Sequence, residues 1–175
     1  SGHELGCHGD LHRDFSTLSE TEADLELRDA LKILRTFGEV RSFRAPYLRF
    51  PTAYCHLLTA HGLQNDSSLA RYKFGAHHST APSHPGLVRV PVSATSSVLR
   101  LPALIRTPWL RRLQQPLVIF IHPWEAVDFR HSELRLDCRV KTGPVAIDCW
   151  RDALQRAGES GFRFLRLDEI ARTSP

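Results

Sequence analysis

The feature that most constrains the fold is a repeated order of short apolar segment, polar loop and helix. The apolar segments are predicted as strands, at residues 5–8, 40–43, 63–66, 87–92, 117–121 and 162–167. Helices are predicted at residues 19–37, 51–60 and 145–157, within residues 102–115, and as a terminal turn at 167–172. This alternation predicts an α/β fold, in which parallel strands form a sheet or barrel and the helices cross between them.

Three segments show this pattern in detail. Ser19 and Glu22 have the spacing of a capping box, which predicts the start of a helix, and Gly38 predicts its end. Residues 117–121 form a continuous apolar run, which predicts the most completely buried strand. Residues 70–86 are rich in His, Ser, Pro and Gly, and we predict a long loop that faces the substrate.

The composition argues against several classes of function. With 175 residues, of which 42% are hydrophobic, the chain can form one domain with a sizeable core. Its net charge of +4 is dispersed, and Arg111 and Arg112 are the only adjacent basic pair, so no nucleic-acid partner is predicted. No apolar run reaches the length of a membrane span, and the first residues lack the apolar region of a signal peptide. The four cysteines include no Cys-x-x-Cys pair, which argues against a structural zinc site.

The polar residues that can carry chemistry lie at the ends of predicted strands. His8 and His12 follow the first strand, Arg44 follows the second, Asp66 ends the third, and His122 follows the run at 117–121. In parallel α/β folds, active sites gather at the carboxyl ends of the strands. We therefore predict a single site drawn from the whole chain.

His8 and His12 are candidate metal ligands. Their imidazoles can reach one ion if the chain turns sharply between them, and Gly9 permits such a turn because glycine tolerates a positive φ. Imidazole nitrogen suits a divalent ion such as Zn²⁺. The alternative is that these are two of ten scattered histidines.

Together, these residue types fit the hydrolysis of an amide or ester. A metal ion would lower the pKa of a bound water and polarise a carbonyl. His122 would protonate a leaving amine, Asp66 would hold His122 in the right tautomer, and Arg44 would orient a carboxylate. The alternatives are a plain turn after Asp66, an ordinary strand exit at Arg44 and a strand cap at His122.

Four stretches stand in the order and spacing of the motifs of one family. They are a His-rich stretch at residues 2–12, Arg-Ala-Pro-Tyr within 43–47, Asp-Ser within 65–68 and an apolar run ending in His at 119–122. They resemble the polysaccharide deacetylases, the NodB-homology carbohydrate esterases that remove N-acetyl groups from chitin, peptidoglycan and related glycans. The resemblance continues through the closing strand and helix at 161–170, so it covers essentially the whole chain.

The resemblance implies a distorted (β/α) barrel of the NodB type. It also implies a metal-dependent hydrolase that acts on the carbon–nitrogen bond of an acetylated glycan. The divalent ion, expected to be Zn²⁺, would be held by His8 and His12.

The same resemblance implies roles for four other residues. Arg44 would steady the catalytic base, and Tyr47 would offer its backbone N–H to the oxyanion. Asp66 would tune His122, which would act as the acid. Apart from the resemblance, Trp124 is a candidate substrate-binding residue, because its aromatic ring could stack on a sugar.

The chain departs from the family at its first motif. The family carries an Asp-Asp pair, in which one carboxylate is the catalytic base and the other the third metal ligand, and no adjacent Asp pair occurs in this sequence. We therefore expect residues 1–175 to be a polysaccharide deacetylase domain without its N-terminal part. Such a chain would release acetate poorly, and its open barrel edge would be covered by a second copy or by another protein.

Two further hypotheses stand beside the enzyme. The first is a non-catalytic carbohydrate-binding relative, in which Tyr47, Tyr72, Trp109 and Trp124 stack on sugar rings, although core packing is favoured for Trp109 and Trp150. The second is a packing domain that keeps the motif residues but binds neither metal nor ligand. Family members are often exported or associated with the cell envelope, and the sequence assigns this chain to no compartment.

Overall fold

The computed structural model describes residues 2–71, 84–113, 115–134 and 136–173. The chain forms two compact units, the first comprising Ser1–Val92 and Leu165–Pro175 and the second Ser93–Phe164. Most of the predicted substrate-facing loop, including Tyr72, lies outside the described residues. Within the described ranges, no helix combines the length and the apolar character that crossing a membrane requires.

The described residues of the first unit form four strands, three α-helices and three short 3₁₀ helices. In chain order they are β1 (Leu5–Cys7), η1 (Phe15–Thr17), α1 (Glu20–Leu34), β2 (Val40–Phe43), η2 (Pro46–Leu48), η3 (Thr52–Tyr54), α2 (Cys55–Ala60), β3 (Asn65–Asp66), β4 (Val88–Arg89) and α6 (Leu167–Thr173).

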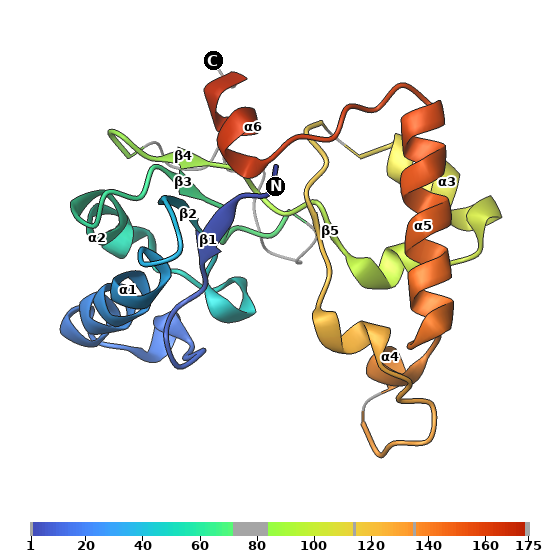
Figure 1. Cartoon of the computed structure of the whole chain (residues 1–175), viewed down its shortest axis with the longest axis horizontal. Helices are drawn as coiled ribbons and strands as arrows, with labels where there is room; N and C mark the ends of the chain where they lie inside the picture. Colours follow the sequence, from blue (N-terminus) through green and yellow to red (C-terminus); the bar gives the residue numbers. More distant parts are fainter. Residues whose placement is uncertain (1, 72–83, 114, 135, 174–175) are drawn as a thin grey trace. The chain divides into compact units, whose positions relative to one another are not determined.

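The strands of the first unit form one parallel sheet in the order β1-β2-β3-β4. The register places Cys7 beside Phe43, Phe43 beside Asp66, and Asp66 beside Arg89. All four strands therefore end along one edge of the sheet. Helix α1 packs against β1, and α6 packs against β2 and β3 (Figure 1).

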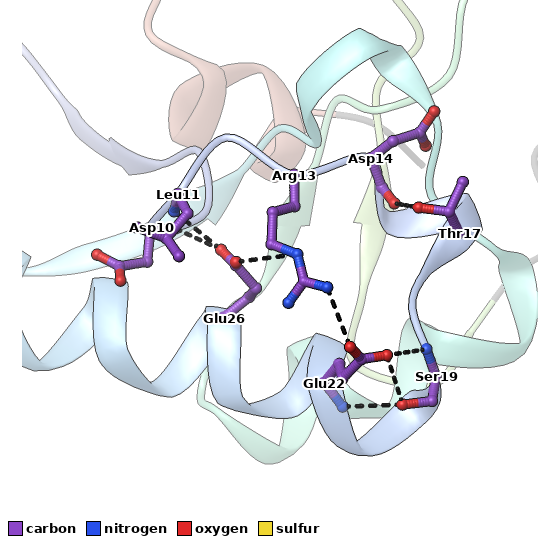
Figure 2. Close-up of polar contacts among 8 residues, drawn as sticks. All are labelled: Asp10, Leu11, Arg13, Asp14, Thr17, Ser19, Glu22 and Glu26. Atoms are coloured by element: carbon purple, nitrogen blue, oxygen red, sulfur yellow. Dashed lines mark hydrogen bonds and ion pairs between the residues drawn. The ribbon is translucent and has the colours of Figure 1, made fainter.

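Helix α1 begins where the capping box predicts. The Ser19 side chain accepts a hydrogen bond from the Glu22 N–H, and the Glu22 carboxylate accepts one from the Ser19 N–H at 2.9 Å (Figure 2). On its inner face, α1 buries Ala23, Glu26, Leu27, Ala30 and Leu31. Burial of a leucine side chain contributes about 1.5–3 kcal/mol, so this stripe fixes the helix on the sheet.

An aromatic cluster forms the core beneath the loop that follows β1. Phe15, Phe43 and Phe50 are buried, and their ring centroids lie 5.1–5.5 Å apart. Such edge-to-face contacts add to the free energy of burial. The turn after β1 therefore packs against a closely packed aromatic cluster.

The two ends of the chain meet in the first unit. The Glu4 carboxylate accepts a hydrogen bond from the Asp168 N–H at the start of α6, at 3.1 Å, and another from the Ser42 hydroxyl on β2. This carboxylate satisfies one of the N–H groups that the first turn of a helix leaves without a partner. Helix α6 is thereby joined to the strands at the beginning of the chain.

In the second unit, the residues that the structure describes form two strands, three α-helices and two 3₁₀ helices. In chain order they are β5 (Ala94–Thr95), η4 (Ser96–Arg100), α3 (Ala103–Arg111), β6 (Ile119–Phe120), η5 (Pro123–Ala126), α4 (Leu136–Arg139) and α5 (Pro144–Glu159).

The second unit has a short parallel sheet and a polar link between its helices. Strand β5 pairs with β6, with Ala94 beside Ile119. Arg106 on α3 is buried, donates a hydrogen bond to the Leu99 carbonyl at 2.7 Å and forms an ion pair with Asp152 on α5. A buried guanidinium needs such partners, because an unpaired buried charge is costly.

Four predicted strands differ from the structure. The strand predicted at 63–66 is reduced to the two residues of β3. The run at 117–121 has only the two residues of β6 in a strand, and Ile121 is 41% exposed, because its pairing partner β5 is equally short. The strand predicted at 87–92 is reduced to β4 and an isolated bridge between Ala70 and Val92. Residues 162–166 are not a strand, since among the described residues none pairs with them and Phe164 is 60% exposed.

Candidate functional site

The structure brings His8 and His12 together on the loop that follows β1. Their ring centroids lie 5.1 Å apart at an interplanar angle of 69°, and both residues are exposed. Gly9 has a φ of 80°, as the sharp turn requires. The two imidazoles therefore lie on one side of the turn, at the carboxyl edge of the sheet.

Backbone strain concentrates at the same place. His12, Tyr47 and Leu48 have φ values of 55°, 59° and 53°, and Lys141 is the only other non-glycine residue with a positive φ among the described residues. Each such residue costs about 1–3 kcal/mol and persists only where its surroundings enforce it. Strain of this kind is typical of functional sites.

Arg44 connects the histidine loop to the next two strands. Its carbonyl oxygen lies 2.6 Å from Nδ1 of His8, and because a carbonyl only accepts, Nδ1 carries the proton. This tautomer leaves the lone pair of the ring on Nε2, which is the arrangement common in metal-ligating histidines. The Arg44 guanidinium donates to the Ser67 carbonyl at 3.1 Å and to the Ser67 hydroxyl at 2.9 Å, just past β3.

Tyr47 completes this group on the side of β2. Its ring lies edge-on to His12, with centroids 5.1 Å apart, and the residue is 56% exposed. The ring contact with His12 thus lies at a residue whose backbone has a positive φ, as does that of the next residue, Leu48. An exposed aromatic ring beside polar groups is a surface on which a sugar ring can stack.

The donor chemistry of His8 and His12 fits a divalent ion such as Zn²⁺, which accepts imidazole nitrogen readily. Catalytic zinc sites use three protein ligands and keep one position open. Over the ranges that the structure describes, no group of three or more His, Cys, Asp and Glu side chains could hold an ion. The pair could thus provide two of the three ligands that such a site needs.

Asp66 lies at the end of β3 and is almost completely buried. Its Oδ2 lies 2.8 Å from Nε of Arg89 on β4, in an ion pair whose side chains are 0% and 2% exposed. Its Oδ1 accepts hydrogen bonds from the Ser68 N–H at 3.0 Å and from the Ser68 hydroxyl. Both carboxylate oxygens are therefore engaged within the first unit.

His122 and Trp124 lie in the second unit, around η5. Nδ1 of His122 lies 3.3 Å from Oε1 of Glu125, a residue that is 1% exposed, while the His122 side chain is 47% exposed. The Trp124 ring stacks on the imidazole, with centroids 5.4 Å apart. Glu125 also accepts a hydrogen bond from Ser96. Because Asp66 belongs to the other unit, its pairing with His122 stays a prediction.

Three residues that contact the predicted site residues or their loop were not predicted from the sequence. Glu26 supports the histidine loop, Arg89 pairs with Asp66, and Glu125 faces His122. For two of these residues, the sequence contains a feature that could have identified them. Glu26 lies on the apolar stripe of α1, where a charge is unusual, and Glu125 stands three residues after His122, at the start of a helix.

A cavity of about 350 Å³ opens elsewhere in the first unit. Arg41, Gln64 and Val88, which line it, lie toward the amino ends of β2, β3 and β4. None of the predicted site residues lines this cavity. The cavity is therefore separate from His8, Arg44 and Asp66, which lie at the carboxyl edge of the same sheet.

Comparison with known proteins shows what the chain is similar to. Residues 1–65 match the family model described as polysaccharide deacetylase. No curated protein is significantly similar to the chain. The fold is similar to a family 4 carbohydrate esterase from Streptomyces lividans in complex with acetate, at 14% identity and a TM-score of 0.50, over 89% of this chain and 62% of that one. A protein from Mycobacterium smegmatis assigned as a polysaccharide deacetylase is 20% identical, with a TM-score of 0.45, over 91% of this chain and 47% of that one.

The chain spans less than two thirds of the length of these solved structures. Its fold is similar to that of the carbohydrate esterase from Streptomyces lividans. The match of residues 1–65 to the polysaccharide deacetylase model agrees with the resemblance seen in the motifs over that stretch. This stretch carries His8, His12, Arg44 and Tyr47 and stops before Asp66 and His122.

Proposed function

We propose that this chain carries a metal-dependent hydrolase site that removes acetyl groups from N-acetylated polysaccharide by cleaving the amide C–N bond. The meeting of His8 and His12 at the carboxyl end of β1 carries this proposal. The match of residues 1–65 to the polysaccharide deacetylases supports the choice of substrate. The products are acetate and the free amine of the sugar.

In this proposal, His8 and His12 hold the ion, which is Zn²⁺. When bound, a zinc ion polarises the acetyl carbonyl and lowers the pKa of a water molecule. The Arg44 carbonyl fixes the tautomer of His8. The guanidinium of Arg44 would steady a carboxylate base. Because this sequence has no Asp-Asp motif to provide that base, acetate release by residues 1–175 alone is expected to be slow. The backbone N–H of Tyr47 faces the oxygen that becomes negative during the reaction.

The leaving amine needs a proton, and His122 supplies it as general acid. Trp124, stacked on His122, offers an aromatic surface to the sugar. Asp66 acts on His122 if the two units bring them together. Glu125 is the carboxylate that already faces the imidazole, at 3.3 Å.

We also propose that residues 1–175 form one polysaccharide deacetylase domain built on a distorted (β/α) barrel. The parallel order β1-β2-β3-β4 and the helices α1 and α2 between its strands support this architecture. β1 lies at one end of that order, and a second copy or another protein chain is the proposed cover for its open edge.

A second candidate function is carbohydrate binding without hydrolysis. The exposed ring of Tyr47, 56% accessible and held in a strained backbone, favours it, since such rings stack on sugars. In that case, the protein binds acetylated chitooligosaccharides but releases no acetate.

Zinc binding and acetate release test the proposal together. Titration calorimetry should show zinc binding to the wild-type chain and its loss in His8→Ala and His12→Ala. His56→Ala is the matched control, because His56 is also an exposed histidine of the first unit but bonds to Glu20 and Ala53 instead. Zinc binding unaffected by both site substitutions refutes the metal site. Glycan binding without zinc-dependent acetate release favours the second function.

A further inference from the structure

One buried carboxylate, on helix α1, accepts hydrogen bonds from the loop between His8 and His12. Oε2 of Glu26, on α1, accepts hydrogen bonds from the backbone N–H groups of Asp10 and Leu11, at 2.9 and 3.0 Å (Figure 2). Oε1 of the same carboxylate lies 3.9 Å from Nε of Arg13. Glu26 thus contacts the loop on both sides of His12.

The burial of Glu26 shows that this contact is specific. Its side chain is 4% exposed, and it lies on the stripe of α1 that otherwise buries alanine and leucine. Burying a carboxylate is costly unless hydrogen bonds satisfy it. Hydrogen bonds from N–H groups to an ionised acceptor are stronger than neutral ones, so two of them on one oxygen offset much of that cost.

The geometry of the turn depends on the same carboxylate. A Cβ atom at Gly9 would lie 3.6 Å from Oε2 of Glu26 and 3.3 Å from Cε2 of Phe15, so the loop is in close contact with α1. His12 adopts a positive φ, a conformation that requires enforcement by its surroundings. The hydrogen bonds that the Asp10 and Leu11 N–H groups donate to Glu26 constrain the backbone directly before His12 and so help to enforce its positive φ.

We propose that Glu26 is a positioning residue that holds His8 and His12 in the geometry for metal binding. The inference rests on the proposed metal site and assigns to Glu26 a role in its affinity, not a contact with the ion. Removal of an interaction that orients metal ligands typically weakens metal binding by about 10- to 100-fold.

The test uses zinc binding to the full chain and to three variants. Glu26→Ala should weaken zinc binding by about 10- to 100-fold. Glu26→Gln should weaken it less, because its amide oxygen can still accept both N–H bonds. Glu22→Ala is the matched control on the same helix, since Glu22 caps α1 and bonds Arg13 without touching the loop before His12. Its zinc affinity should equal that of the wild type.

Two further measurements separate positioning from general stability. The visible absorption spectrum of bound Co²⁺ should change in Glu26→Ala and not in Glu22→Ala, although both variants lower the melting temperature of the metal-free chain. If Glu26→Ala does not fold, the smaller change expected for Glu26→Gln carries the test. Equal zinc affinity in the wild type and the Glu26 variants overturns the inference alone. A wild-type chain that binds no zinc refutes the metal site of the proposed function as well.

Discussion

Asp66 and Arg89 form an ion pair across neighbouring strands, and both side chains are almost completely buried. Oδ2 and Nε are 2.8 Å apart, and the register of β3 and β4 places the two residues side by side. Such a pair can fix the register of two strands, since shifting either strand would leave both charges unpaired. Asp66 therefore has a structural role in the first unit, besides the catalytic role that the motif implies.

Removing Arg89 should destabilise the first unit strongly. Arg89→Ala leaves the Asp66 carboxylate buried without its cation, and breaking a buried pair in this way costs about 3–5 kcal/mol. The free energy of unfolding, measured by urea denaturation, reports the loss. The double variant Asp66→Asn, Arg89→Met should recover most of it, because it leaves no buried charge. Equal instability in the single and the double variant would show that the cost lies in packing.

The Glu125 carboxylate should determine the tautomer of His122. A carboxylate only accepts hydrogen bonds, so its 3.3 Å contact with Nδ1 of His122 favours the proton on that nitrogen. The ¹⁵N chemical shifts of the neutral ring should show this tautomer in the wild type and a mixture in Glu125→Gln. Unchanged shifts in Glu125→Gln would count against the assignment.

The same spectra test the predicted pairing of Asp66 with His122. Asp66→Asn should alter the ¹⁵N shifts of the His122 ring if the two units bring these side chains together. Ser68→Ala is the control, since it removes one hydrogen bond to Asp66 and keeps the carboxylate. Ring shifts that respond only to Glu125→Gln would make Glu125 the sole partner of the imidazole.

Local signals in the sequence predicted the start of α1 and the extent of β2. The capping box of Ser19 and Glu22 depends on residues three apart, and the short strand at 40–43 lies between Gly38 and Pro46. Gly9 likewise marked its turn, because a positive φ is a local requirement. Such features need no knowledge of distant contacts.

The features that could not be predicted depend on contacts between residues far apart in the sequence. The partner of Asp66 depends on the register of β3 and β4, which is not visible before the strands pair. The run at 117–121 has the composition of a buried strand, but the length of β5 limits its pairing to two residues. Residues 162–166 alternate in polarity like a strand, yet no described strand lies beside them.

Substitution of Gly9 should disturb both stability and metal binding. Gly9→Ala places a Cβ at a φ of 80°, which costs about 1–2 kcal/mol for an L-residue, and brings it 3.3 Å from Phe15. Gly62→Ala is the matched control, because its φ is 74° but the nearest atom is the end of the Arg35 side chain, at 3.6 Å. Both variants should melt at lower temperature, and only Gly9→Ala should bind zinc more weakly. Equal zinc affinities in Gly9→Ala and Gly62→Ala would show that zinc binding does not depend on the conformation of the turn at Gly9.

The capping box should make α1 sensitive to acid. The pKa of Glu22 is lowered from 4.5 to about 2, chiefly because its carboxylate accepts hydrogen bonds from the backbone and side chain of Ser19, and further because it bonds Arg13. A lowered pKa in the folded state means that the ionised carboxylate stabilises the fold above pH 4.5, and that this stabilisation is lost as the pH falls toward 2. The melting temperature of the wild type should therefore fall more steeply between pH 4.5 and 2 than that of Glu22→Gln. Ser19→Ala should lower stability by about 1 kcal/mol at neutral pH and flatten the same acid transition. Parallel pH profiles for the wild type and Glu22→Gln would show that the capping carboxylate does not govern the acid response.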